Sequence, residues 1–411
     1  MALLIQNIQQ LAGIRYKNKL LRGAELAQLS VLDNAYLVVE EDTILDFGVM
    51  EELSGAEAYE EVIDASGQTI LPAWCDSHTH LVFAASREEE FVAKLKGMTY
   101  AEIAAQGGGI LNSAKKLNAM PQELLYDLAS ERLLELMQKG TGAIEIKSGY
   151  GLTVEGELKM LRVIKQLKER ARIPIKATFL GAHAYPLEYK ENQDGYIKLL
   201  INELLPNIAL EKLADYVDVF CEEGFFSVGA MDTICNAAAK YGLQPKLHVN
   251  QLNSFGALQK AIELKAVSAD HLETMTEKDI ADVAASSTIG TLLPTAAYFL
   301  RMPFQPARAL IDAGAAIALA SDFNPGSSPS GNMNTVVSMS CIQMKMLPEE
   351  AINAATINGA FAMGVQEQTG SISIGKKANL IFTKPVPSIN YIPYAFGSDL
   401  IDKVMLNGEI I

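Results

Sequence analysis

The chain has 411 residues, of which 49% are hydrophobic, and a formal net charge of -15; this length suits an α/β barrel with a small companion domain. The negative charge argues against binding to nucleic acid or to anionic membrane surfaces, because protein and phosphate groups would repel each other. No apolar stretch is long enough for a membrane span or a signal peptide, and the four scattered cysteines are typical of reduced thiols in a cytoplasmic protein.

The two ends of the chain show strand patterns and few helices. Residues 1–70 contain a hairpin expected at Tyr36–Phe47, and residues 365–411 return to strand patterns after a last helix at Glu349–Met363. Neither end holds enough alternating apolar residues to form a domain alone, because a small sheet needs a partner to bury one face. We therefore expect 1–70 and 365–411 to meet in one composite β-sandwich domain.

Residues 71–364 alternate short apolar runs with helical patterns such as Val154–Arg170. Near-continuous apolar runs are typical of parallel strands that are covered on both faces. Eight such units predict a (β/α)8 TIM barrel, in the α/β class. A doubly wound open sheet is the weaker alternative, because it would not bring the ends of distant strands to one point. The expected strands are Thr69–Asp76, Ala143–Lys147, Ile175–Leu180, Tyr216–Cys221, Gln244–Val249, Ala266–Ala269, Ile289–Leu293 and Ala316–Ala320.

The chain has five histidines, and each lies at the end of one of these runs. Active sites of such barrels lie at the carboxyl ends of the strands, and histidine is the commonest metal ligand. A set of His and Asp ligands favours zinc or iron over calcium or magnesium, although a single His on a strand is more often a packed structural residue than a ligand. The polar residues at the run ends are His78 and His80 after the first, His183 after the third, His248 in the fifth, His271 after the sixth and Asp322 after the eighth.

This arrangement resembles the metal-dependent amidohydrolase superfamily and, more narrowly, the imidazolonepropionase family. The His78-Thr79-His80 motif specifies only the superfamily, whereas the segments around Tyr150 and Asp322–Ser330 are more specific. The match spans nearly the whole barrel. The segments that carry it are Asp76–Ala84, Gly97–Ile110, Glu145–Leu152, Thr178–Pro186, Ser268–Glu273 and Ser321–Ser330.

The resemblance implies hydrolysis of the cyclic amide 4-imidazolone-5-propanoate to N-formimidoyl-L-glutamate, a step of histidine degradation, by metal-activated water. It implies one divalent metal per chain, Zn²⁺ or Fe²⁺/Fe³⁺, a small-molecule substrate and a homodimer. The implied metal ligands are His78, His80, His248 and Asp322. The implied substrate contacts are Arg87, Tyr150, His183, Gln251, Asn324, Gly326 and Ser327.

Catalytic roles are expected for Asp322, His271 and Gln251. Asp322 accepts a proton from water and passes it to the departing ring nitrogen, while His271 stabilises the developing oxyanion. Some family members carry a glutamate where this chain has Gln251; because glutamine cannot take a proton, it can only orient water or substrate. Glu222 or Glu223 could bridge a second metal, but contacts within the loop are the favoured use, so we expect one metal.

Two other functions stay open at this point. One is another mononuclear amidohydrolase, such as a deaminase acting on a purine ring, which would not need Arg87, Tyr150 and Asn324. The other is a non-catalytic binding or scaffold protein built on a hydrolase barrel, which would typically have lost metal ligands. Without the resemblance, Arg87 is typical of a solvated loop, and Tyr150 and His183 of the barrel rim.

Overall fold

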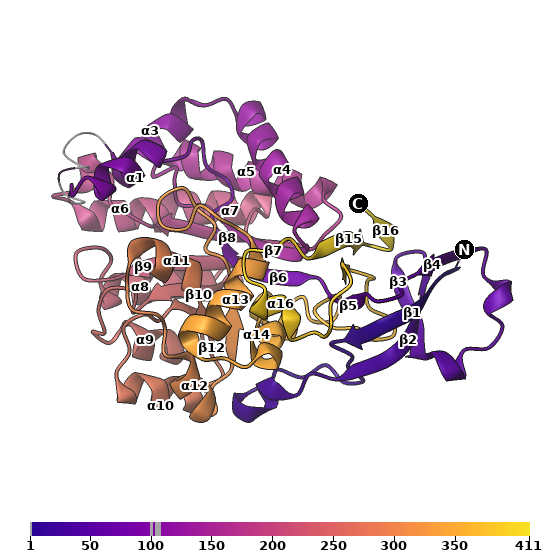
Figure 1. Cartoon of the computed structure of the whole chain (residues 1–411). Coiled ribbons are helices and arrows are strands. Elements are labelled where there is room, and N and C mark those ends of the chain that lie inside the picture. The colour runs from indigo at the N-terminus through magenta and orange to yellow at the C-terminus, as the bar shows by residue number, and fades with distance from the viewer. Residues whose placement is uncertain (1, 99–101, 103–107) are drawn as a thin grey trace.

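The computed structural model describes residues 2–98, 102 and 108–411 and contains two large sheets (Figure 1). One sheet is wrapped into a barrel, and the other is built from both ends of the chain. Most of the segment Gly97–Ile110, which carries part of the resemblance, lies outside the described residues.

Eight parallel strands form the barrel and follow one another in chain order, which confirms the expected α/β barrel. Most of their residues are buried, because side chains of the strands fill the inside of the barrel and helices cover its outside. The ring is closed by a bridge between Thr79 and Phe323, which joins the first strand to the segment after the last. The strands are β6 (Trp74–Thr79), β7 (Thr141–Lys147), β8 (Ile175–Ala182), β9 (Tyr216–Cys221), β10 (Gln244–Val249), β11 (Ser268–His271), β12 (Ile289–Leu292) and β13 (Ile317–Leu319).

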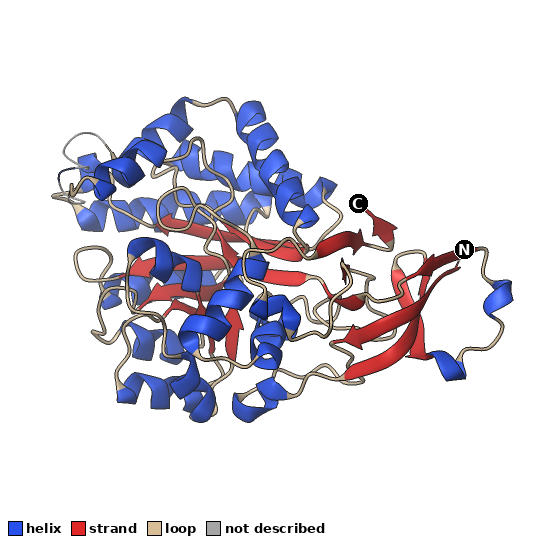
Figure 2. Ribbon diagram, in the orientation of Figure 1, coloured by secondary structure: helices blue, strands red, loops and turns tan. Residues whose placement is uncertain are grey.

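Helices surround the barrel strands, as Figure 2 shows. In α5, the side chain of Thr153 accepts a hydrogen bond from the backbone of Gly156 and caps the helix, and Leu158, Leu161 and Ile164 are buried on one face. The helices are α1 (Glu88–Leu95), α3 (Gly109–Ala119), α4 (Gln122–Gln138), α5 (Val154–Arg170), α6 (Gln193–Leu199), α7 (Leu205–Glu211), α8 (Val228–Ala239), α9 (Ala257–Glu263), α10 (Glu277–Ala285), α11 (Pro294–Leu300), α12 (Ala307–Asp312), α13 (Met333–Met344), α14 (Pro348–Ala355), α15 (Ile357–Ala362) and α16 (Tyr391–Tyr394).

The second sheet joins strands from both ends of the chain, in the order β16-β15-β14-β5-β1-β2-β3, and β4 also pairs with β1. The expected hairpin is formed by β2 and β3, with Glu40 opposite Thr43. The ends meet where β14 pairs with β5, with Ile381 opposite Leu71. The strands are β1 (Ala2–Ala12), β2 (Val31–Glu40), β3 (Thr43–Val49), β4 (Glu61–Asp64), β5 (Thr69–Pro72), β14 (Leu380–Thr383), β15 (Ile401–Leu406) and β16 (Glu409–Ile410).

The apolar run at Thr69–Asp76 crosses from one sheet to the other at Ala73. The backbone N–H of Ala73 donates to the carbonyl of Asn379, directly before β14 of the terminal sheet, and that of Trp74 donates to the carbonyl of Gly140 beside the barrel. The first barrel strand therefore begins at Trp74, and β5 belongs to the terminal sheet.

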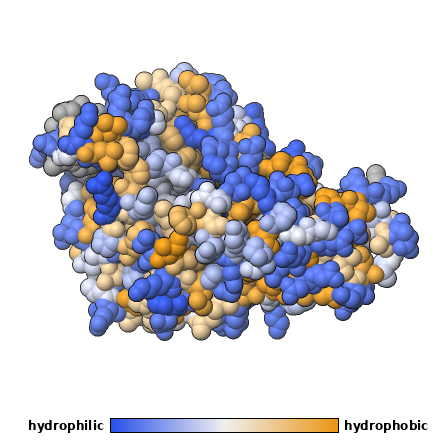
Figure 3. Space-filling view, in the orientation of Figure 1, coloured by the Kyte–Doolittle hydropathy of each residue, from blue (hydrophilic) through white to orange (hydrophobic). Residues whose placement is uncertain are grey.

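Figure 3 shows hydrophobic residues scattered among hydrophilic ones over the visible face. Among the described residues, the helices are all too short or too polar to cross a bilayer.

Candidate metal centre

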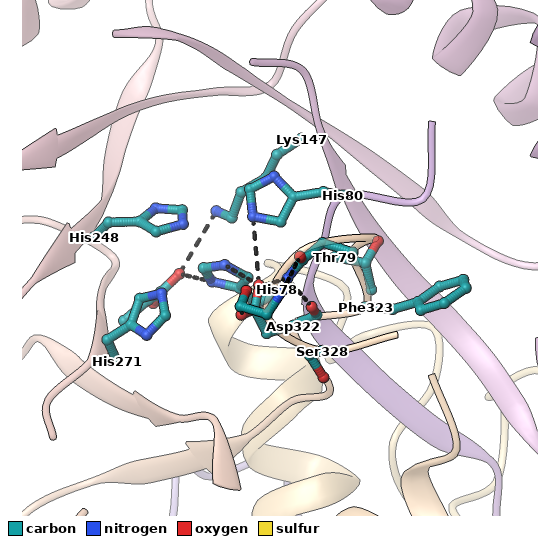
Figure 4. Close-up of polar contacts among 12 residues, drawn as sticks. His78, Thr79, His80, Lys147, His248, His271, Asp322, Phe323 and Ser328 are labelled. Carbon is teal, nitrogen blue, oxygen red and sulfur yellow. Dashed lines mark hydrogen bonds and ion pairs between the residues drawn. The ribbon is translucent and has the colours of Figure 1, made fainter. Parts of the chain in front are cut away.

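Closure of the barrel brings Asp322 next to His78 and His80. The backbone N–H of Asp322 donates to the His78 carbonyl at 3.0 Å, and that of His80 donates to the Phe323 carbonyl at 2.9 Å. As a result, Asp322 Oδ1 lies 3.5 Å from His78 Nε2 and 3.4 Å from His80 Nε2 (Figure 4). Asp322 has a φ of 51°, a left-handed conformation that is uncommon for a non-glycine residue and is concentrated at functional sites.

His248 and His271 reach the same point from β10 and β11. Their ring centroids lie 4.5 and 5.6 Å, respectively, from that of His78. The structure thus brings together the four residues expected as ligands and adds His271 to them. Two overlapping groups place their candidate ligand atoms within 4.8 Å of one another: His78, His248 and His271, and His78, His80 and Asp322.

Three of these imidazoles are held by a carboxylate at Nδ1, which leaves Nε2 to face the shared centre. Such outer carboxylates fix the tautomer and the ring orientation of metal-binding histidines. Sequence reasoning did not single them out, although a carboxylate inside an apolar strand or next to a candidate histidine is a usable signal. The contacts are His78 to Asp270 at 2.7 Å, His248 to Asp218 at 2.7 Å and His271 to Glu273 at 3.2 Å.

The charge states of the cluster suit metal binding. Burial, together with neighbouring cations and imidazoles, lowers the pKa of His78 and His248 well below its usual value, so both are neutral. Burial alone would raise the pKa of Asp322, but the hydrogen bond with His80 and the charge of His271 lower it, so it is a carboxylate. Neutral imidazole and carboxylate are the forms that bind metal.

His271 differs from the other imidazoles. Burial alone would lower its pKa, but the attraction of Glu273, and then of Asp322 and Asp270, raises that pKa to about 9. Protonated imidazole donates hydrogen bonds from both nitrogens and does not bind a metal.

The donor set therefore fits a transition metal. His78 Nε2 and His80 Nδ1 are buried atoms without a hydrogen-bond partner in the described part of the chain, which is costly for a polar group away from water. Three imidazole nitrogens and one carboxylate match the ligands of zinc or iron, and four protein ligands of this kind leave room for a water molecule.

Two cavities of about 60 and 350 Å³ open above the cluster and share six lining residues. The smaller cavity borders His80, His248, His271 and Asp322. The larger is lined by every residue expected to contact substrate: Arg87, Tyr150, His183, Gln251, Asn324, Gly326 and Ser327.

Arg87 lies at the start of α1, on the wall of the larger cavity. Its Nε donates to the Ser113 hydroxyl at 2.9 Å, whereas its buried Nη2 has no partner among the described residues. Gly326 makes room for the guanidinium, because a Cβ at that position would lie 2.6 Å from Arg87 Nη1. The arrangement leaves a planar cationic donor available to an anionic ligand.

Tyr150 and His183 form an aromatic wall beside His80. The His183 ring stacks on that of His80 at 5.5 Å and lies 5.5 Å from the Tyr150 ring. His183 Nδ1 is 3.0 Å from the Gly149 carbonyl, which leaves Nε2 as its other hydrogen-bonding atom. Burial raises the pKa of Tyr150, so the phenol stays protonated and can donate a hydrogen bond.

The loop after β13 is organised by Asn324. Its Oδ1 accepts hydrogen bonds from the N–H groups of Gly326 and Ser327, both at 2.8 Å. Its Nδ2 donates to the Asp322 carbonyl at 2.6 Å and to the Ser327 hydroxyl at 2.8 Å. These four hydrogen bonds use both acceptor positions of Oδ1 and both N–H groups of Nδ2. Asn324 therefore shapes the cavity wall by holding the loop together.

Gln251 borders both cavities, and Glu222 holds its backbone in place. Glu222 accepts hydrogen bonds from the N–H groups of Gln251 at 2.6 Å, Leu252 at 3.2 Å and Asn253 at 3.0 Å. Glu223 is exposed. Because both Glu222 oxygens are engaged with this loop, the carboxylate is used as a loop anchor.

Comparison with known proteins adds a family and close relatives. The model of the amidohydrolase family matches residues 69–411. The imidazolonepropionase of Flavobacterium johnsoniae is 58% identical over 412 residues, and that of Christiangramia forsetii is 52% identical over 412 residues. In both cases the match covers 100% of each chain.

Solved structures with a similar fold include an adenosine deaminase from Xanthomonas campestris with bound zinc, with a TM-score of 0.72 and 17% identity. That match covers 99% of this chain and 92% of the deaminase. The guanine deaminase of E. coli has a TM-score of 0.73 and 12% identity, and the match covers 100% of this chain and 99% of that chain. At this level of identity the likeness concerns the fold.

Proposed function

This chain belongs to the amidohydrolase family, and we propose that it catalyses the imidazolonepropionase reaction, the hydrolysis of 4-imidazolone-5-propanoate to N-formimidoyl-L-glutamate. The observation that carries the proposal is the 58% identity, over the whole chain, to a relative of that name. The enzyme is a hydrolase that breaks the C–N bond of a cyclic amide, a step of histidine degradation. The two cavities that share lining residues support this proposal, because they place Arg87 and the candidate metal centre on one small-molecule site.

The first proposed contact concerns the propanoate group of the substrate. The Arg87 guanidinium offers to this carboxylate its Nη1 and its Nη2, which has no partner in the described part of the chain, and such charge-assisted bonds are stronger than neutral ones. A local cation is needed because the net charge of the protein repels an anion. Tyr150 and His183 flank the imidazolone ring with aromatic surface and one hydrogen-bonding atom each, and Ser327 borders it from the opposite loop.

The residues proposed to hold one divalent metal, zinc or iron, are His78, His80, His248 and Asp322. When bound there, the metal supplies Lewis acidity that lowers the pKa of water and polarises a carbonyl oxygen.

The remaining chemistry is proton transfer by the side chains. Asp322 is ionised, its Oδ1 faces two imidazoles, and its Oδ2 accepts a hydrogen bond from the Ser327 hydroxyl at 3.3 Å. Asp322 accepts a proton as water attacks the lactam carbonyl carbon and returns it to the ring nitrogen as the C–N bond breaks. Protonated His271 stabilises the negative charge that develops on the carbonyl oxygen. Gln251 orients water or the ring through its amide.

The decisive experiment is incubation of metal-replete protein with 4-imidazolone-5-propanoate while the absorbance of the ring is followed. Turnover of this compound with release of N-formimidoyl-L-glutamate is the expected result. Guanine, adenosine and cytosine serve as parallel substrates, because a ring deaminase would release ammonia from them. Ammonia release without ring opening of the imidazolone would reject the proposal.

Two further expectations belong to this proposal. A cytoplasmic location is supported by the four cysteines, all of which are free thiols. A homodimer is supported by the large exposed side chains of Tyr394 and Phe396. Light scattering on the purified enzyme, run across a dilution series, tests the dimer.

A further inference from the structure

A layer of buried charged residues lies in the barrel beneath the candidate metal centre. Its two cations, Lys147 on β7 and Lys246 on β10, are both fully buried. Its three carboxylates, Glu145, Asp218 and Asp270, are buried as well. The roles proposed above leave the two lysines unused, although burying a charge is costly unless it is paired.

Lys147 forms ion pairs with all three carboxylates and donates a hydrogen bond to one of them, Glu145. Its Nζ lies 2.7 Å from Glu145 Oε1, 2.9 Å from Asp218 Oδ2 and 3.5 Å from Asp270 Oδ2. Figure 4 shows Lys147 beside the four histidines of the cluster. Three carboxylates lie within 3.5 Å of the ammonium group, so their attraction determines its position.

The two aspartate oxygens that Lys147 contacts are the same ones that hold the metal-facing histidines. Asp218 Oδ2 lies 2.7 Å from His248 Nδ1, and Asp270 Oδ2 lies 2.7 Å from His78 Nδ1. Lys147 therefore joins two histidines that come from β10 and β6, strands that are not neighbours in the barrel.

The sign of the charges explains why such a link is needed. Two cations against three carboxylates leave the layer with one negative charge, and removal of Lys147 would leave Asp218 and Asp270 facing each other with less compensation. Buried carboxylates that lose their partner move, take up a proton or admit water. Each of these changes would alter the acceptor on which the tautomer and orientation of His78 and His248 depend.

We propose that Lys147 is a positioning residue that presents His78 and His248 to a divalent metal by fixing Asp270 and Asp218 in the barrel core. The inference rests on the metal centre of the proposed function, but it concerns metal binding and not the identity of the substrate.

Lys246 provides a matched control, because it is a lysine of equal burial in the same layer. Its Nζ lies 3.1 Å from Glu145 Oε2 and donates to the Ser268 hydroxyl at 2.7 Å and the Ala362 carbonyl at 3.0 Å. Lys246 is linked to His78 only through two intermediates, because the Ser268 hydroxyl donates to Asp270 Oδ1 at 2.5 Å and Asp270 holds His78. Loss of Lys246 removes a comparable buried charge without removing the direct contacts between Lys147 and the two aspartates, so a smaller effect on the histidines is expected.

The experiment compares the wild-type chain with Lys147→Met and Lys246→Met after removal of metal. Zn²⁺ affinity is measured by competition with a chromophoric chelator, and the visible absorption spectrum of the Co²⁺-loaded proteins reports the ligand geometry. For Lys147→Met we expect about 10- to 100-fold weaker Zn²⁺ binding, the range for loss of an outer partner of a metal ligand, and an altered Co²⁺ spectrum. Lys246→Met is expected to keep the wild-type spectrum and to lose much less affinity.

Wild-type affinity and spectrum in Lys147→Met, or equal losses in both variants, would overturn the inference. If Lys147→Met does not fold, Lys147→Gln, which keeps one donor group, is measured with the same expectation. Failure of both to fold while Lys246→Met folds would assign Lys147 to stability and reject a role in metal presentation. Because Zn²⁺ and Co²⁺ are the only probes, failure of the proposed substrate assay does not affect this result.

Discussion

The substitution Gly326→Ala tests whether Arg87 binds the substrate carboxylate. A Cβ at residue 326 would lie 2.6 Å from Arg87 Nη1 and 3.3 Å from Cζ, so the guanidinium must move. This is the far end of a flexible side chain, and Gly326 does not need a left-handed backbone, so the fold can accommodate the methyl group at little cost. The change therefore displaces the arginine head and leaves the ligands of the candidate metal centre in place.

The expected decrease in kcat/KM follows from the hydrogen bonds between Arg87 and the substrate carboxylate that would be lost. A hydrogen bond to a charged group contributes about 1.5–3 kcal/mol, which corresponds to a decrease in kcat/KM of roughly 10- to 150-fold. We expect most of this loss in KM, because the proposed role of Arg87 is to hold the propanoate group and not the amide that reacts. Metal content and the midpoint of thermal unfolding are expected to match those of the wild type.

Steady-state assays with 4-imidazolone-5-propanoate measure this effect, and an imidazolone that lacks the carboxylate serves as a second substrate. Gly326→Ala should lower kcat/KM for the carboxylate substrate but not for the truncated one. Gly229→Ala is the matched control, because Gly229 is exposed on α8 and its nearest neighbour to a new Cβ is Ser227 Oγ at 3.9 Å. Equal losses on both substrates, or no loss on either, would refute the reasoning.

Four other changes test the remaining roles. Asp322→Asn should lower kcat by at least about 100-fold, which is the scale of general acid–base catalysis. Gln251→Ala removes one neutral hydrogen-bonding group and should lower kcat by less than about tenfold. Comparable losses of kcat in the two variants, measured by steady-state kinetics, would contradict these different roles. Removal of metal with a chelator should stop turnover, and elemental analysis of the reactivated enzyme should find one equivalent per chain, with two equivalents disproving a single-metal centre. Glu222→Gln should keep the metal content of the wild type while raising KM, because the 251–253 loop loses a charged acceptor; a drop in metal content would identify Glu222 as a ligand.

Strand positions in the barrel were predictable because parallel strands that are buried on both faces are continuous apolar runs. Such a run can be recognised in the sequence without knowing which strands lie next to it. The expected bounds of Tyr216–Cys221 and Gln244–Val249 agree with those of β9 and β10, and the helix at Val154–Arg170 agrees with α5. The candidate ligands were equally predictable, since each lies near the end of such a run or just after it and the carboxyl ends of barrel strands share one face.

Two boundaries of strands and helices were not predicted, because they depend on contacts that the local pattern of apolar residues does not show. The run Thr69–Asp76 divides at Ala73 because two different sheets supply the partners of adjacent residues. The expected helix Glu349–Met363 is divided at Thr356, whose hydroxyl donates to the Ile352 carbonyl at 2.7 Å and whose ψ is -91°. No glycine or proline marks that break, and a hydroxyl that bonds to the preceding turn is known to bend helices.

The buried charged layer shows where sequence reasoning could have gone further. Strand β9 carries Asp218 within an apolar run, β10 carries Lys246 in the same way, and Asp270 on β11 directly follows the apolar run Ala266–Ala269. A charge in the wall of a closed barrel cannot reach water, so each must meet an opposite charge from another strand, and the count of charges on the strands alone predicts an ionic layer. The pairing itself is not predictable from alternation, because alternation fixes the face of a strand but not the height at which two side chains meet. That height is set by the stagger of the strands, and it is what allows Lys147 to reach the oxygens of both aspartates.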